Sequence, residues 1–447
     1  MTATPNTDAP DSAEETYSTS YRWYALGLLT VVYAFSHMDR NIIAILLNSI
    51  TEDLNLSDTQ AGAMSGFAFA IFYATLGIPI ARLADRHNRA RIITISLTLW
   101  SAMTAVCGLA GNFWQLLIAR MGVGVGEAGC VPPSQSIIAD YFPQGKRAFA
   151  MGVFGLGVPL GTLMGYGLGG YINEVYDWRV ALYVVGLPGV LVAVVVHFTL
   201  REPPRGLSDK LHAMDDPIPN FMEVLRFIRQ RRSLFHMTIG AALIVFGGYG
   251  SQTWIPAFFE RSHGLSSAEI GLKLGPVFII GGVGGALFGG WLADKWGSRD
   301  PRWYMRIPAL AILPAVPFSV IIMLMPATTY SIGGIEVASS LIAILLMIVP
   351  GAAYSCYLGP TNAMLQQMVS LRMRATTVAI FLLVTNLIGM GLGPLTIGIV
   401  SDVMDQWFGA ESLRYTMLSF LFIYVWAAYH FFRAARTITA DLEAARL

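Results

Sequence analysis

The sequence predicts an all-α membrane protein with twelve transmembrane helices in two six-helix repeats and both termini in the cytoplasm. Three observations support this fold class: the composition, the number of long apolar segments, and the distribution of Lys and Arg around them. The chain has 447 residues, of which 55% are hydrophobic and 13% are charged, whereas about a quarter of the residues of an average soluble protein are charged. The net charge of +1 excludes a protein that binds nucleic acid through a strong basic excess.

Twelve apolar segments are long enough to cross a bilayer as helices. A hydrocarbon core of about 30 Å needs about 20 helical residues, because each residue adds a rise of about 1.5 Å. In chain order we place the spans at residues 22–48, 59–82, 89–110, 113–139, 148–172, 179–199, 234–260, 267–293, 303–325, 337–368, 375–400 and 413–434.

The Lys and Arg residues are strongly biased to one side of these spans. With the N-terminus in the cytoplasm, twenty-three of them lie at cytoplasmic ends or in cytoplasmic loops, and only Arg179, Arg261 and Arg414 lie on the opposite side. Cytoplasmic loops of membrane proteins carry an excess of Lys and Arg. The asymmetry therefore predicts cytoplasmic termini and a multi-pass protein of the plasma membrane, which is the inner membrane in a Gram-negative cell.

A long polar interruption between spans six and seven divides the chain. The predicted parts are a cytoplasmic tail at 1–20, an N-terminal bundle at 21–200, a linker at 201–232, a C-terminal bundle at 233–436 and a second cytoplasmic tail at 437–447. The first tail is polar and acidic, unlike a secretory signal, and we expect it to be disordered. Residues 220–232 (NFMEVLRFIRQRR) predict a basic amphipathic helix that lies either on the inner leaflet or in solvent.

An internal repeat relates the two halves. The loop after span two reads ARLADRHNR (Ala81–Arg89), and the loop after span eight reads GWLADKWG (Gly290–Gly297). Each contains Leu-Ala-Asp followed by a basic residue, so that Asp85 and Asp294 occupy corresponding positions. Parallel six-span repeats are typical of transporters whose halves rock against each other.

Several motifs together resemble the major facilitator superfamily and, more closely, its Spinster family. The matching residues are the loop Ala81–Arg91, Arg120, Gly124, Gly126 and Glu127 of ARMGVGVGEAG in span four, Pro159 of FGLGVPLGTLMG in span five, His37–Asn41 (HMDRN) in span one and Leu56–Gly62 (LSDTQAG) before span two. The loop after span two departs from the superfamily signature, because Ala81 and Asn88 stand where Gly is usual.

The resemblance implies a secondary transporter that works by alternating access. Animal Spinster proteins export sphingosine-1-phosphate or transport lysophospholipids, so the expected substrate is an amphipathic lipid and the expected coupling ion is the proton. The alternative is a proton-coupled transporter of small organic anions. Membrane enzymes and ligand-gated receptors are further possibilities for a helical bundle, but GxxxxGK[ST], HExxH and GxSxG motifs do not occur in the sequence.

Four ionisable residues inside the spans stand out, because a charge at such a position costs several kcal/mol to bury. Asp39 lies about 25 Å from the cytoplasmic end of span one, and Arg120 lies about 10 Å below the outer surface in span four. Arg40 follows Asp39, and Glu127 lies two helical turns beyond Arg120 on the same face. The four charges either form a neutral packing cluster or hold a transported proton. The resemblance favours a proton-coupling role for Asp39 and Glu127 with Arg40 and Arg120 as partners.

The substrate site is expected to combine this charged half with an apolar and aromatic second half. Arg40 would anchor an anionic phosphate, because its guanidinium group presents two parallel donors. The other candidate substrate-binding residues are Tyr249, Gln252 and Trp254 in span seven, Tyr354 and Tyr357 in span ten, and Asn386 in span eleven. Animal Spinster transporters tend to have a His where Asn386 stands.

A gate is predicted at the cytoplasmic mouth, where Asp85 and Asp294 lie at the ends of spans two and eight. In the superfamily, the acidic residue equivalent to Asp85 meets basic residues and the N-terminal end of helix 11, which is positive because of the helix dipole. The alternative is that these charges only set topology. The gating candidates are Asp85, Arg86, Arg89, Arg147, Asp294, Lys295 and Arg374.

The sequence shows no sign of a disulfide, a metal site or a cofactor site. The three cysteines, Cys107, Cys130 and Cys356, lie inside apolar segments and show no CxxC spacing, which favours a packing role. We expect no cofactor, no metal site, no catalytic residues and no nucleic-acid partner. We expect a monomer whose partners are its amphipathic or anionic substrate, protons and membrane lipids.

Overall fold

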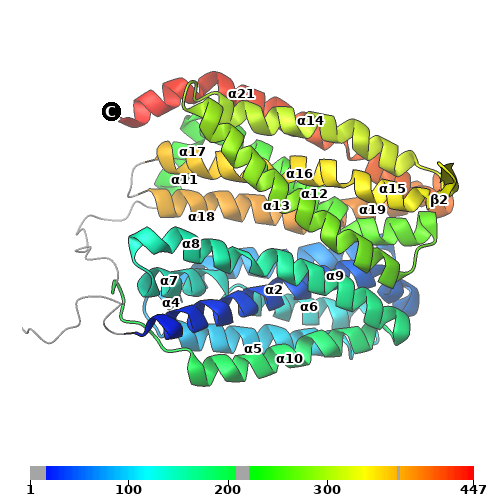
Figure 1. Ribbon diagram of the computed structural model, residues 1–447, viewed down its shortest axis with the longest axis horizontal. Coiled ribbons are helices and arrows are strands. Elements are labelled where there is room, and N and C mark those ends of the chain that lie inside the picture. The colour runs from blue at the N-terminus through cyan, green and yellow to red at the C-terminus, as the bar shows by residue number, and fades with distance from the viewer. Residues whose placement is uncertain (1–16, 208–220, 370–372, 447) are drawn as a thin grey trace, which may run out of the picture.

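The computed structural model describes residues 17–207, 221–369 and 373–446, and most of them are helical (Figure 1). In the N-terminal half, six helical paths are α2 (Thr19–Leu54); α3 (Asp58–Gly62), the π-helix η1 (Ala63–Phe67) and α4 (Ala68–Ala84); α5 (Arg89–Cys107); α6 (Phe113–Glu127) and α7 (Val131–Tyr141); α8 (Gln144–Gly155) and α9 (Gly157–Val175); and α10 (Trp178–Thr199). These paths follow the six predicted spans.

The C-terminal half repeats this arrangement. Its six paths are α12 (Arg232–His263); α13 (Ser267–Gly297); α14 (Trp303–Leu324); α15 (Ser339–Leu346), α16 (Ile348–Ser355) and α17 (Leu358–Gln367); α18 (Arg374–Thr385), the π-helix η2 (Asn386–Leu392) and α19 (Gly393–Phe408); and α20 (Ser412–Ser419) and α21 (Phe422–Arg446), which the 3-10 turn η3 (Gly409–Glu411) precedes. The predicted all-α membrane fold is therefore confirmed, and the twelve helical paths of the described residues are consistent with the predicted twelve spans.

Among the described residues, nine segments are long and apolar enough to cross a membrane, and the last of them, Thr376–Ala444, contains two of the paths. The two paths outside this set are α2 and the α6–α7 pair. These are the paths that carry Asp39, Arg40, Arg120 and Glu127. A function is expected for these four residues, because charged side chains inside a membrane are costly to bury.

Figure 1 shows the two halves as separate bundles, with α2 to α10 below and α12 to α21 above. We call the end that contains Thr19 and Arg446 the inner end, which the charge bias assigns to the cytoplasm, and the opposite end the outer end. Short polar residues begin many of the helices: Asn112 accepts a hydrogen bond at the start of α6, Asp177 does so for α10, and Ser266 forms a capping box on α13.

Glycines allow the helices to meet backbone to backbone. A Cβ atom added at Gly161 of α9 would collide with the carbonyl oxygen of Ala34 on α2, within the N-terminal bundle. Between the bundles, a Cβ at Gly170 would collide with Ser267 of α13, and one at Gly271 would collide with Tyr166 of α9. Small residues permit this close approach in membranes. Because Gly170 and Gly271 lie toward the outer end, the bundles are sealed against each other in their outer halves.

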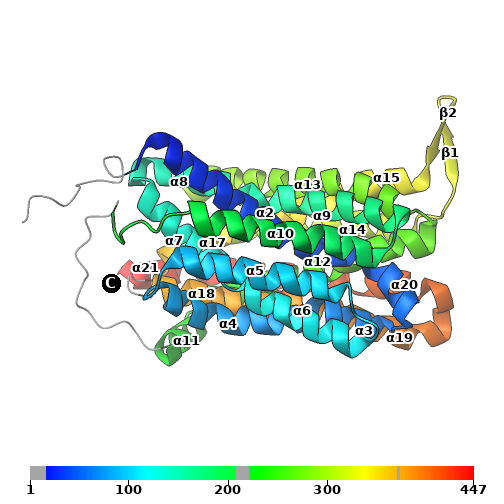
Figure 2. The same ribbon diagram turned by 90° about the horizontal axis from the view of Figure 1, so that it is seen from below.

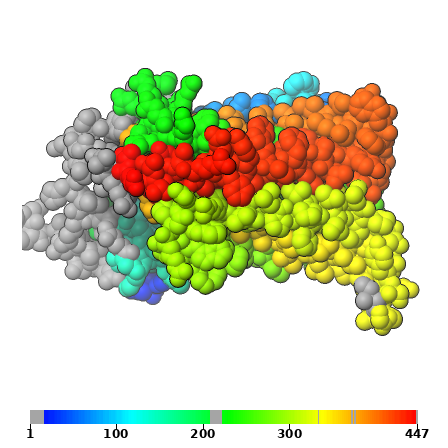
Figure 3. All heavy atoms as spheres, turned by 90° about the horizontal axis from the view of Figure 1, so that it is seen from above, coloured from blue at the N-terminus to red at the C-terminus, as the bar shows by residue number. Residues whose placement is uncertain are grey.

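Parts of the segments outside the bundles lie within the described residues. The predicted tail at 1–20 lies outside the described residues up to residue 16, while Ser18 caps α2. The predicted amphipathic helix forms as α11 (Phe221–Gln230) and buries Val224 and Ile228 against the C-terminal bundle. Helix α21 continues through residues 437–446 and lies along the surface of the C-terminal bundle, as Figure 3 shows.

A β-hairpin at the outer end was not predicted. Strands β1 (Thr329–Ile332) and β2 (Ile335–Ala338) connect α14 to α15 and pair in antiparallel fashion. Figure 2 shows this hairpin crossing the direction of the helices and reaching past their flank. The predicted tenth span therefore begins at Ser339 instead of residue 337, because residues 335–338 belong to the second strand.

Candidate functional site

The four buried charges meet where α2 passes the end of α6. The Arg40 Nε atom donates a hydrogen bond of 2.6 Å to Glu127 Oε2, and Ser36 Oγ donates one of 2.7 Å to the same oxygen. The Glu127 side chain is fully buried, and 12% of the Arg40 side chain is exposed. Glu127 is the last residue of α6, where the chain turns before α7. The predicted neighbourhood of these charges on α2 and α6 is present, with Arg40 and Glu127 as a direct ion pair.

The aromatic face of α4 holds the two arginines. The Arg40 guanidinium carbon lies 5.0 Å from the centre of the Phe69 ring and 4.5 Å from that of Tyr73. The Arg120 guanidinium carbon lies 5.5 Å from the Phe69 ring. Both cations therefore contact one ring, which attracts them through its quadrupole. This contact orients the guanidinium groups and leaves some of their donors available.

Several polar atoms of the cluster have no hydrogen-bond partner among the described residues. They are both carboxyl oxygens of Asp39, Oε1 of Glu127, Nη2 of Arg40, and Nε and Nη1 of Arg120. Buried polar atoms are nearly always paired, and each one left alone costs about 1–3 kcal/mol or more when charged. A site with such unpaired donors and acceptors is suited to bind a proton, water or an anionic ligand.

A small cavity adjoins the cluster at the interface between the bundles. Its lining consists of Arg40, Asn41, Ala44, Ser65, Phe69 and Arg120 from the N-terminal bundle and Tyr249, Gln252, Thr253, Met390 and Pro394 from the C-terminal bundle. Its volume is about 40 Å³, which holds a few water molecules at about 10–15 Å³ each. The cavity in this conformation is therefore too small for a lipid, although it brings both arginines to the bundle interface.

An amide pair bridges the bundles beside this cavity. Gln252 Nε2 on α12 donates a hydrogen bond of 2.9 Å to Asn41 Oδ1 on α2. Asn41 in turn donates to the His37 carbonyl oxygen at 2.7 Å and to Thr162 Oγ1 at 3.2 Å. The residue after Arg40 thus forms a direct hydrogen bond between the two bundles near the cavity.

Two π-helical segments border the same cavity. Ser65 belongs to η1 and Met390 belongs to η2, and a Cβ at Gly66 would lie 2.8 Å from the Met390 carbonyl oxygen. Single π-helical turns inside α-helices frequently occur at functional sites. They lie in spans two and eleven, which contact each other across the bundle interface. The sequence offers a signal only in its small residues, because π-helical turns have no motif of their own.

The predicted substrate-binding residues are distributed between the cavity and the C-terminal bundle. Tyr249 and Gln252 line the cavity. Trp254 is buried, and its Nε1 atom donates to the Pro394 carbonyl oxygen at 2.9 Å. The rings of Tyr354 and Tyr357 meet at 6.2 Å, and Tyr354 packs against Gly248 of α12. Asn386 is the first residue of η2. The cavity lining does not include the last four of these six residues.

At the outer end, a group of polar contacts around Arg261 joins the two bundles, and we call it the outer lock. The sequence analysis did not predict these contacts. Arg261 on α12 contacts both carboxyl oxygens of Asp58 on α3, at 2.9 and 3.0 Å, and Asn48 Oδ1 on α2 at 2.9 Å. Asp402 on α19 accepts from the backbone N–H groups of Asp58 and Thr59 at 2.9 and 2.8 Å. The available signal was one of the three Arg residues on the arginine-poor side, together with the Asp of LSDTQAG.

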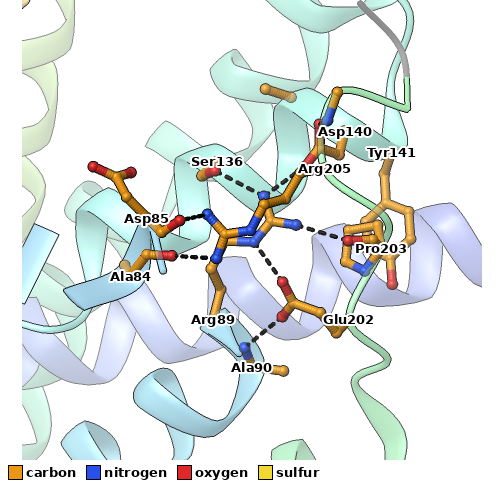
Figure 4. A network of polar contacts seen from close by, with 12 residues as sticks. Ala84, Asp85, Arg89, Ala90, Ser136, Asp140, Tyr141, Glu202, Pro203 and Arg205 are labelled. Carbon is orange, nitrogen blue, oxygen red and sulfur yellow. Dashed lines mark hydrogen bonds and ion pairs between the residues drawn. The ribbon is translucent and has the colours of Figure 1, made fainter. Parts of the chain in front are cut away.

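At the inner end, Arg89 is the centre of a network within the N-terminal bundle (Figure 4). Arg89 pairs with Asp140 at 2.5 Å and with Glu202 at 2.6 Å, and only 2% of its side chain is exposed. Arg205 of the linker donates to the carbonyl oxygens of Ala84, Asp85 and His87 at the end of α4. The beginning of the linker is therefore fixed to this bundle.

The other predicted gating residues lie around this inner mouth. Arg147 donates to the Ala139 carbonyl oxygen at 2.8 Å. Asp294 accepts from the Tyr304 hydroxyl group at 3.3 Å, and Lys295 lies 4.8 Å from the centre of the Trp291 ring. Each of these contacts joins residues of the same bundle. The side chains of Asp85 and Arg86 are exposed, and that of Arg374 lies outside the described part of the chain. The gating roles stay a prediction.

Comparison with known proteins agrees with this architecture. The family model of the Major Facilitator Superfamily matches residues 29–394. A crystal structure of a bacterial homologue of the human lysosomal transporter Spinster, in an inward-facing and unoccupied conformation, superimposes with a TM-score of 0.84 at 33% identity and covers 95% of this chain and 99% of that one.

Two curated relatives support the same family. An MFS-type efflux pump of Mycolicibacterium smegmatis is 32% identical over 89% of this chain and 88% of its own length. The sphingosine-1-phosphate transporter SPNS2 of Xenopus tropicalis is 26% identical over 87% of this chain and 76% of its own length. The chain therefore belongs to the Major Facilitator Superfamily, a family of multi-pass membrane transporters and not of enzymes, and within that superfamily it is a Spinster homologue.

Proposed function

We propose that this transporter moves an amphipathic anionic lipid, such as a lysophospholipid or a sphingosine-1-phosphate-like molecule, and couples the movement to protons by alternating access. The observation that carries the proposal is the position of Arg40, which pairs with the buried Glu127 carboxylate and also lines the cavity between the bundles. One guanidinium group is thus within reach of both a proton site and a substrate site.

Competition for Arg40 links the two sites. When an anionic headgroup engages Arg40, Glu127 loses part of its charge-assisted hydrogen bonding and more readily accepts a proton. When Glu127 releases its proton, it binds Arg40 again and displaces the headgroup. Asp39, whose carboxyl oxygens make no hydrogen bond among the described residues, is the second proton-accepting group of the same cluster.

The bundle contacts determine which side is open. The glycine contacts and the Arg261–Asp58 lock close the outer half, so that the headgroup would enter from the inner side. A change of bundle orientation would then break this lock and close the inner mouth around Asp85 and its basic neighbours. Both bundles and the cavity belong to one chain, which supports a monomer as the transporting unit.

The lipid class is supported by the apolar and aromatic part of the cavity lining. Tyr249 and Met390 line the cavity together with the two arginines, and the similar SPNS2 protein of Xenopus tropicalis is a sphingosine-1-phosphate transporter. The alternative substrate, a small organic anion, would use the same arginines without needing an apolar contact.

The test uses purified protein in proteoliposomes with an imposed pH gradient and a fluorescent lysophospholipid in one leaflet. We expect gradient-dependent movement of this lipid between leaflets, monitored by accessibility to a membrane-impermeant quencher. Lipid movement at the same rate with and without the pH gradient would contradict proton coupling. Transport of a radiolabelled dicarboxylate, without any movement of the lipid, would replace the lipid proposal by the organic-anion alternative.

A further inference from the structure

The β-hairpin at the outer end has two chemically different faces. Its register pairs Tyr330 with Val337 and Ser331 with Glu336. Directly paired residues of antiparallel strands point to the same side, and residues two apart along a strand share a face. Tyr330, Ile335 and Val337 therefore form one apolar face, while Ser331 and Glu336 belong to the opposite, polar face.

The turn makes this arrangement definite. Gly333 and Gly334 connect the strands with φ angles of +60° and +86°. Two-residue hairpin turns with positive φ at both positions match the twist of the strands and fix the register. A one-residue slip would exchange the two faces, so the Gly-Gly turn preserves the separation of apolar and polar side chains.

The protein itself leaves the apolar face open. Tyr330 is 39% exposed and Ile335 is 69% exposed. An isolated two-stranded hairpin is marginally stable in water, and these side chains gain nothing from facing solvent. A contact between this face and an apolar surface outside the protein would stabilise the hairpin.

The position of the hairpin identifies the surface that is available to it. The hairpin follows α14 and precedes α15, at the outer ends of these two spanning helices. Figures 2 and 3 show it extending sideways past the flank of the C-terminal bundle instead of outward along the helix direction. It therefore lies above the place where the outer leaflet surrounds this bundle.

The two helices that flank the hairpin also expose apolar side chains near their outer ends. Ile321 and Leu324 at the end of α14 are 51% and 50% exposed, and Leu345 of α15 is 52% exposed. In a spanning bundle these exposed side chains contact acyl chains. The hairpin extends this surface from the hydrocarbon region into the interfacial region.

We propose that residues 329–338 form an interfacial membrane contact, in which the face of Tyr330, Ile335 and Val337 inserts into the headgroup and acyl-chain boundary of the outer leaflet. Tyr is enriched at this depth because its ring is apolar and its hydroxyl group is polar. Glu336 is the one charged residue of the segment and belongs to the polar face, so the contact uses apolar insertion and does not require anionic lipids.

The proposal can be tested with single spin labels on the full-length protein in phosphatidylcholine nanodiscs. Labels at Ile335→Cys and Tyr330→Cys probe the apolar face from both strands, and labels at Ser331→Cys and Glu336→Cys are the matched controls on the polar face. The native cysteines, Cys107, Cys130 and Cys356, are buried, and labelled wild-type protein measures their background. Power saturation compares collisions with oxygen, which partitions into lipid, and with a water-soluble nickel chelate.

We expect oxygen collisions to dominate at residues 330 and 335 and nickel collisions to dominate at residues 331 and 336, a reversal between neighbouring positions. Nickel access at all four positions would place the hairpin in water and overturn the proposal. Protection from nickel on both faces would indicate a covering protein instead. If that protein is a second copy, dilution with unlabelled protein in liposomes would remove spin–spin broadening.

Discussion

The Nε atom of Arg40 lies 2.6 Å from Oε2 of Glu127, and the same guanidinium group lines the cavity between the two bundles. The pair is buried in the N-terminal bundle, and Ser36 is a second hydrogen-bond donor to the Glu127 carboxylate. A charge pair with this burial is costly to separate unless another partner replaces the one that leaves. An anionic substrate for Arg40 and a proton for Glu127 are replacements that preserve the electrostatic balance.

We predict that Glu127→Gln abolishes the response of transport to a pH gradient while the protein stays folded. A Gln side chain keeps an oxygen that can accept from Ser36 Oγ and Arg40 Nε, but it cannot exchange a proton. Asp39→Asn should have the same effect. The measurement is the rate of lysophospholipid movement in proteoliposomes with and without an imposed gradient. Asp53→Asn, at an exposed pair with Arg179 outside the cluster, is the control. A gradient response of wild-type size in both cluster variants would leave only a packing role for these carboxyl groups.

We predict that Arg40→Ala weakens the binding of a phosphate-bearing lysolipid by about 10- to 100-fold, because a hydrogen bond to a charged group contributes about 1.5–3 kcal/mol. Arg40→Lys should have an intermediate affinity, since Lys keeps the charge but loses the planar pair of donors. Titration of a fluorescent lysophospholipid into purified protein measures the dissociation constant. Equal affinity of all three proteins would show that the headgroup binds elsewhere. An uncharged monoacylglycerol in the same titration should be insensitive to both changes.

We predict that Arg261→Ala shifts the population toward conformations that are open at the outer end. The substitution removes the contacts to Asp58 and Asn48 and leaves the Asp58 carboxylate without its cation. A change of about 1.4 kcal/mol alters the ratio of two conformations tenfold. Spin labels at Tyr176→Cys and Gln406→Cys, which are exposed at the outer ends of the two bundles, report the separation. The expected result is a larger fraction of long distances.

The control for the outer lock is Arg179→Ala. Its partner is Asp53 at 2.5 Å, and both residues belong to the N-terminal bundle at the same outer end. This variant changes the charge equally but leaves the bundle interface intact, so its distance distribution should match that of the unsubstituted protein. The same distribution in the Arg261 variant would show that the glycine contacts alone keep the outer side closed.

The spans and the depth of the buried charges could be predicted because hydropathy and helix rise depend on sequence position alone. The sequence could not predict which charged residues pair with each other, because this depends on how each helix is rotated about its axis. Depth placed Arg120 near Asp39, yet the direct pair is Arg40 with Glu127. In the same way, Arg89 was a gating candidate beside Asp85, whereas it pairs with Asp140 of α7 and Glu202 of the linker.

The hairpin shows a different limit of sequence reasoning. Residues 329–338 lie between two long apolar spans, and their own alternation of apolar and polar side chains is short compared with a helical span. The Gly-Gly dipeptide flanked by β-branched and aromatic residues was the available signal. A search for spans of about 20 residues assigns part of this segment to the following helix, which is why residue 337 was expected to begin the tenth span.

The last prediction concerns the inner network. Arg89 is buried and holds the end of α7 and the start of the linker through Asp140 and Glu202, and Glu202 also accepts from the backbone N–H of Ala90 at 3.0 Å. Removing one partner of a buried pair leaves an uncompensated charge and costs about 3–5 kcal/mol. Arg89→Ala should therefore lower the free energy of unfolding by about 3 kcal/mol or more.

This loss can be measured by titration with sodium dodecyl sulfate in mixed micelles, monitored by tryptophan fluorescence. Arg91→Ala is the matched control, because Arg91 is exposed two residues further along the same helix and surface substitutions usually change stability by about 0.5 kcal/mol or less. Since Glu202 and Arg205 lie in the same short linker segment, the Arg89 variant should also release this segment from α4, which a label at Gly206→Cys would report as faster motion. Unchanged stability together with unchanged motion at residue 206 would show that the network is dispensable and that the Arg205 contacts to the end of α4 suffice to hold the linker.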